Sequence, residues 1–109
     1  MEVETLSREQ VIRLGVDGFW DHVEAVQQTR NQLDAYLVFL AGVGEEIVAA
    51  PRVGERSMGA AIAKQTGVPR SEGNKIALAA SRLGHVPPLV EPFRSGEVCT
   101  SQVLSLIHI

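Results

Sequence analysis

A row of apolar residues spaced alternately three and four positions apart constrains the fold more than any other feature of this sequence. The row comprises Phe19, Val23, Val26, Leu33, Leu37, Leu40 and Ile47. Arg30 occupies the one place in the row where an apolar residue is expected. This spacing puts the row on one face of an α-helix. We therefore predict a long helix over residues 19–41 that buries this face, widened by Trp20, Tyr36 and Phe39.

The composition favours helices throughout. The 109 residues suffice for one modest hydrophobic core, and only 5% of them are aromatic although 45% are hydrophobic. Ser7 and Gln10 have the spacing of a capping box, which predicts a first helix beginning at about Arg8. Gly15 and Gly18 follow, and they leave open whether this helix runs on or breaks. We expect an all-α fold: a long N-terminal helix or helix pair packed on a bundle of shorter helices.

The second half of the chain contains clear helix starts and stops. Ser57 is positioned to cap a helix over residues 58–66, and Gly67 stands where a left-handed residue ends it. After the turn, Ser71 is positioned to cap a further helix over residues 72–83. The result is two short helices joined by a tight turn.

This helix-turn-helix-like pair at about residues 58–83 has two interpretations. Ala63 and Gly67 fit the small contact residue and the turn glycine of a DNA-binding motif, whose second helix reaches phosphates and base edges. The side chains that would do so are Arg70, Asn74, Lys75 and Arg82. Gly73, however, stands where such motifs usually have a β-branched core residue, and a plain helical hairpin explains the same residues. Both interpretations stay open.

Charge and cysteine content limit the partners and the compartment. Residues 1–50 hold nine acids and three bases, and residues 51–109 hold seven bases and four acids. The mildly basic second half permits binding to double-stranded DNA without requiring it. A single cysteine, Cys99, excludes a disulfide within the chain and suits a reducing compartment. Neither a membrane-spanning stretch nor a signal peptide is evident, so we expect a cytoplasmic protein without membrane contact.

No group of residues has the spacing of a catalytic or metal site. His22 lies beside Asp21 and Glu24 but lacks a second histidine at helical spacing, which favours a solvated surface side chain. No nucleophile, base and metal ligand are grouped in the sequence. We expect this chain not to be an enzyme by itself, and to hold no metal and no cofactor.

A succession of turns and small residues in the second half is characteristic of one known family. It consists of Gly67 and Val68, Ser71, Ala77 to Leu83, Pro87, Val90, and Gly96 to Val98. In these features the chain resembles the core of the DUF 222, or 13E12-repeat, family. The resemblance covers about the second half, and the first half agrees only as generic N-terminal helices. Gly73 replaces the alanine usual in the family, and Pro92 is unusual within its short helix.

The resemblance implies a role beside a nuclease. Members of the family commonly carry a C-terminal HNH endonuclease domain, in which histidines and an asparagine bind a divalent metal. His85 and His108 are not spaced or flanked as in that motif. The resemblance therefore implies a non-catalytic helical fragment of an HNH-endonuclease-like protein, with the metal only in a nuclease domain.

The last six residues, LSLIHI, are identical to the translation of a transposon-end adapter used to prepare sequencing libraries. We interpret residues 1–103 as a single, partial helical domain and residues 104–109 as a non-native tail. The alternative is a native apolar continuation of a final helix that starts at Thr100 or Ser101. A truncated helix would leave Leu83, Val98 and Val103 poorly covered.

Two functions follow from these observations. The leading interpretation is a non-catalytic helical domain that contributes to binding of double-stranded DNA. The alternative is a structural or protein-interaction module in which the apolar face of residues 19–40 pairs with another helix, with no role in nucleic-acid binding.

Overall fold

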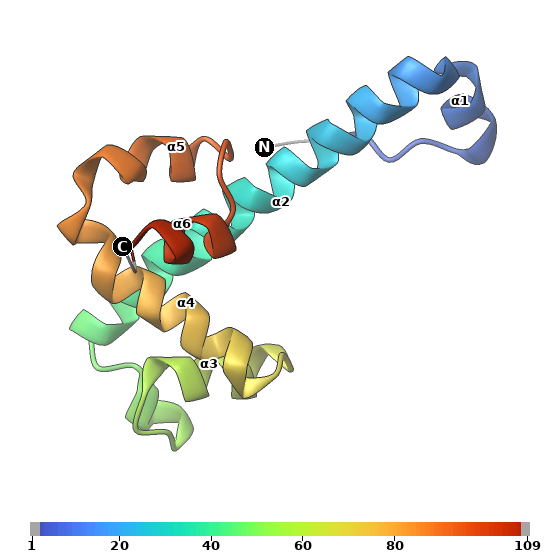
Figure 1. The fold of residues 1–109 in the computed structure, drawn as a ribbon. Helices are drawn as coiled ribbons and strands as arrows, with labels where there is room; N and C mark the ends of the chain where they lie inside the picture. Colours follow the sequence, from blue (N-terminus) through green and yellow to red (C-terminus); the bar gives the residue numbers. More distant parts are fainter. Residues whose placement is uncertain (1–2, 108–109) are drawn as a thin grey trace.

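The computed structural model describes residues 3–107, which form helices and no strand (Figure 1). The α-helices are α1 (Arg8–Arg13), α2 (Gly15–Glu46), α3 (Met58–Thr66), α4 (Arg70–Arg82), α5 (Val90–Arg94) and α6 (Thr100–Ile107). Three 3-10 turns connect them: η1 (Ala50–Val53), η2 (Leu83–His85) and η3 (Pro87–Leu89). The prediction of an all-α fold with one long helix packed against shorter ones is confirmed.

The N-terminal region forms two helices. Ser7 and Gln10 make the predicted capping box: the Ser7 hydroxyl accepts from the Gln10 amide, and the Gln10 side chain accepts from the Ser7 amide. The chain breaks at Gly15, whose φ of 75° is left-handed and favours glycine. Gly18 lies inside α2. The first helix therefore does not run on: the chain breaks at Gly15, and Gly18 does not interrupt the second helix.

The helix α2 was predicted correctly, but the face that it buries was not. Its buried residues are Asn31, Ala35, Val38, Ala41 and Gly44. The predicted apolar face is largely exposed to solvent, from Phe19 at one end to Leu40 at the other. The buried side carries small residues, which let the backbones of neighbouring helices approach closely. The helix thus packs on its neighbours through residues that permit close approach, and the wider row of large apolar side chains stays outside this contact.

The core lies where the second half of α2 meets α4, α5 and α6 (Figure 1). Phe93 of α5 is 1% exposed, and it packs with Val38 of α2 and Ala79 of α4. From α6, Val103 is fully buried, and Leu104 joins it in the same cluster. The expectation that Val103 would be poorly covered was therefore wrong.

The end of the chain continues the last helix. α6 begins at Thr100, one of the two predicted starts, and extends through Ile107. Leu83 and Val98 are partly buried against the core. Of the six residues interpreted as a non-native tail, residues 104–107 are helical, while His108 and Ile109 lie outside the described residues. Helical continuation is compatible with both origins of this segment.

A polar contact joins α2 to the turn between α5 and α6. The amide of Asn31 donates to the carbonyl oxygen of Gly96 at 3.1 Å. The amides of Gln28 and Gln32 both donate to the carbonyl oxygen of Ser95, at 3.2 and 3.0 Å. Gly96 has a φ of 86°, and a Cβ atom there would collide with the Gln28 backbone. This turn is thus held against α2 by side-chain amides and by a glycine that permits the approach.

The molecule is elongated because the N-terminal part of α2 projects from the rest (Figure 1). The radius of gyration is 16.4 Å, whereas a compact domain of this length has one of about 13 Å. We call residues 15–27 the α2 arm; α1 lies at its tip (Figure 1). None of the helices within residues 3–107 is long and apolar enough to cross a membrane.

Candidate functional site

The helices α3 and α4 form the predicted pair joined by a tight turn. The Ser57 hydroxyl accepts from the Ala60 amide at 3.2 Å, and Gly67 ends α3 with a φ of 76°. The predicted cap at Ser71 was wrong, since α4 begins at Arg70. The carbonyl oxygen of Pro69 accepts the first hydrogen bonds of α4. Proline, with its φ fixed near the helical value and its carbonyl free, starts the helix earlier than the serine hydroxyl would.

The two helices cross backbone to backbone at a pair of glycines. A Cβ atom on Gly73 would collide with the carbonyl oxygen of Gly59 and would lie 3.1 Å from the Cβ of Ala63. A Cβ atom on Gly59 would in turn lie 3.0 Å from the Cα of Asn74. A β-branched residue, as in the usual DNA-binding motif, could not occupy position 73 in this arrangement. Gly73 is therefore explained by the close crossing.

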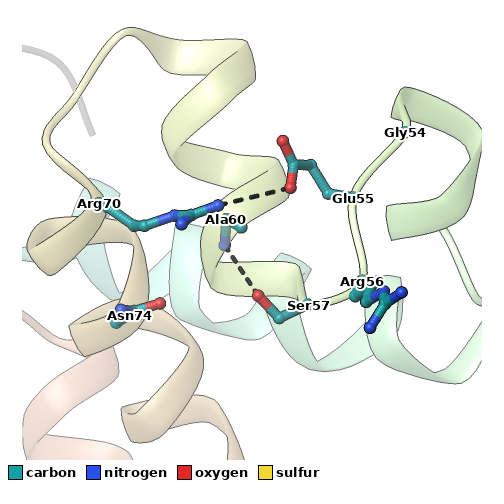
Figure 2. Close-up of a pocket in the computed structure, with 7 residues that line it drawn as sticks. All are labelled: Gly54, Glu55, Arg56, Ser57, Ala60, Arg70 and Asn74. Atoms are coloured by element: carbon teal, nitrogen blue, oxygen red, sulfur yellow. Dashed lines mark hydrogen bonds and ion pairs between the residues drawn. The ribbon is translucent and has the colours of Figure 1, made fainter.

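Two of the four candidate DNA-contacting residues line one hollow beside this crossing. The hollow, of about 440 Å³, is lined by Gly54, Glu55, Arg56, Ser57, Ala60, Arg70 and Asn74 (Figure 2). The Arg70 side chain extends across it to Glu55, with 3.6 Å between Nη2 and Oε2 (Figure 2). The Arg70 side chain remains 71% exposed. This ion pair at the surface contributes little energy.

The other two candidates lie elsewhere on α4. Lys75 pairs with Glu72 at 3.3 Å, and Arg82 is an exposed residue at the end of the helix. Lys75 is about 100° around the helix from Asn74, and Arg82 is two turns further on, about 10 Å along the axis. The structure thus brings Arg70 and Asn74 together, and it does not bring Lys75 and Arg82 to the same place.

The exposed side of α2 forms a second candidate site, which we call the α2 seam. It comprises Val16, Phe19, Val23, Val26, Arg30, Leu33, Leu37 and Leu40. The apolar members other than the half-buried Leu37 are between 37% and 75% exposed. Single exposed apolar residues are ordinary on a protein surface, but a contiguous row of them marks an interaction site. The α2 seam, which is interrupted by Arg30 and the half-buried Leu37, is a candidate for such a site.

A carboxylate flanks the middle of the seam. Partial burial raises the pKa of Asp34, the Arg30 guanidinium one turn earlier lowers it, and the carboxylate of Glu72 on α4 raises it. The net pKa lies above the ordinary value for an aspartate. Asp34 and Glu72 thus place negative charge beside the only charged member of the α2 seam.

The described residues offer no obvious chemical centre. Within residues 3–107, no three histidine, cysteine or acidic side chains gather in a way that could hold a metal ion. In the same range, no buried side-chain nitrogen or oxygen lacks a hydrogen-bond partner. The features available for function are therefore surfaces: the hollow beside α3 and α4, and the α2 seam.

No family model, no curated protein and no solved structure matches this chain.

The sequence did not predict that the α2 seam is exposed. Apolar residues that face the core of their own chain have the same helical spacing as apolar residues that face another chain. One feature could have separated them. The row from Phe19 to Ile47 covers 29 residues, and periodic patterns longer than about 25 residues suggest a coiled coil, a membrane-spanning helix or a helical repeat. The glycine crossing of α3 and α4 had a weaker signal: Gly59, Ala63 and Gly73 are small residues on facing helices.

Proposed function

We propose that this chain is a non-catalytic helical module that associates with another helix through the α2 seam. The observation that carries the proposal is that six of the seven apolar seam residues are exposed, from Val16 to Leu40, while the buried residues of α2 begin only at Asn31. Burying apolar surface is the main favourable term in protein association, at roughly 25 cal/mol per Å². Seven apolar residues along one helix supply such surface.

Binding of a hydrophobicity-sensing dye such as ANS tests this function. Val23→Asp places a charge in the α2 seam, while Ala25→Asp places the same charge on another side of the same exposed helix. At concentrations where the chain is monomeric, we expect the wild type and Ala25→Asp to bind the dye and Val23→Asp to bind less. Equal dye binding by all three proteins would refute an apolar seam available to partners.

DNA binding is a second candidate function, favoured by the charge around α3 and α4. Residues 51–86 hold six bases and two acids. Arg70 is largely exposed on the side of the hollow, where the first turn of α3 also lies. Because each phosphate contact releases counterions, binding should weaken with salt in proportion to the number of contacts. The observations for this candidate are weaker, since Arg70 and Lys75 already pair with acids.

Fluorescence anisotropy with labelled duplex DNA separates the two functions. If α4 contacts DNA, Arg70→Ala and Lys75→Ala should each reduce the slope of log K against log salt by about 1. Arg13→Ala, on α1 at the far end of the α2 arm, serves as the matched control and should leave the slope unchanged. Absence of binding at low salt would eliminate DNA as a partner.

The resemblance to DUF 222 supports a proposal about the parent protein. The resemblance implies that residues 1–103 are a non-catalytic part of an HNH-endonuclease-like protein. The identity of LSLIHI to the adapter translation supports an adapter origin for residues 104–109. Independent reads of the gene test both points. An HNH motif encoded downstream of codon 103 would support the parentage, whereas a native reading frame that encodes LSLIHI and continues would eliminate the adapter origin.

A further inference from the structure

We draw no further inference here: the strongest candidate, the hollow at the N-terminus of α3, is crossed by an Arg70 side chain that already pairs with Glu55, and no buried polar side chain within residues 3–107 is left without a partner to point to a ligand there.

Discussion

Gly73→Ala tests whether α3 and α4 cross at backbone contact. The added Cβ would meet the carbonyl oxygen of Gly59, which is fixed within α3, and the Cβ of Ala63 at 3.1 Å. Neither atom can rotate away, so the two helices must separate. Overpacking of this kind costs about 3 kcal/mol or more when the obstacle is backbone. Alanine returns about 1 kcal/mol through its helix propensity, which leaves a net loss of about 2 kcal/mol.

Gly42→Ala is the matched control, because Gly42 also lies inside a helix but has room. A Cβ atom there has only the Cβ of Ala80 nearby, at 4.0 Å. The control should therefore gain up to about 1 kcal/mol. Thermal unfolding followed by far-ultraviolet circular dichroism should show a midpoint lower by roughly 10 °C for Gly73→Ala and higher by about 5 °C for the control. A Gly73→Ala protein at least as stable as the wild type would refute the close crossing.

Three further substitutions probe the core, a cap and a titrating group. Phe93→Ala should cost about 3–5 kcal/mol, because Phe93 is 1% exposed in the centre of the core, and urea titration should show the loss of stability. Ser57→Ala removes the cap of α3 and should cost about 1 kcal/mol in the same assay. Asp34→Asn should stabilise the monomer at neutral pH. Burial raises the folded-state pKa of Asp34, so the carboxylate opposes folding above that pKa and ceases to do so as the pH falls through it. The advantage of Asp34→Asn should consequently shrink as the pH is lowered from 7 into the acid range, and an advantage that stayed constant would contradict the assignment.

Local signals predicted the helix boundaries well because capping is local chemistry. The Ser7 capping box, the Ser57 cap and the left-handed Gly67 need only residues within one turn of each other. Ser71 failed as a predicted cap because Pro69, two residues earlier, already supplies the first acceptor of α4. Pro69 and Ser71 are both able to start a helix, and α4 begins after Pro69, which comes first in the chain.

The buried face of α2 could not be predicted from periodicity. The spacing shows which residues share a face, but it does not show whether that face meets the same chain or another. Ala35 and Ala41 belong to the face that packs inward, and Gly44 there contacts Met58 of α3. Small residues allowed this packing at short distance, and a ranking by side-chain hydrophobicity favours the opposite face.

The candidate DNA site was predicted in part. Helical spacing alone puts Arg70 and Asn74 near one another and separates them from Arg82. Arg70 forms an ion pair with Glu55, which lies before α3 and 15 residues away in sequence. Such a contact depends on how the turn after η1 folds, and no local pattern encodes it.

The two candidate surfaces lie on different elements, which makes their functions separable by experiment. The α2 seam extends along the exposed side of α2, whereas Arg70 lies on α4 beside the hollow. If the partner is a second copy of this chain, association gives two basic surfaces to one particle, and DNA long enough to reach both should bind more tightly than short DNA. Val23→Asp should abolish that length dependence and preserve the binding of a single chain to short DNA, a combination that neither function alone would produce.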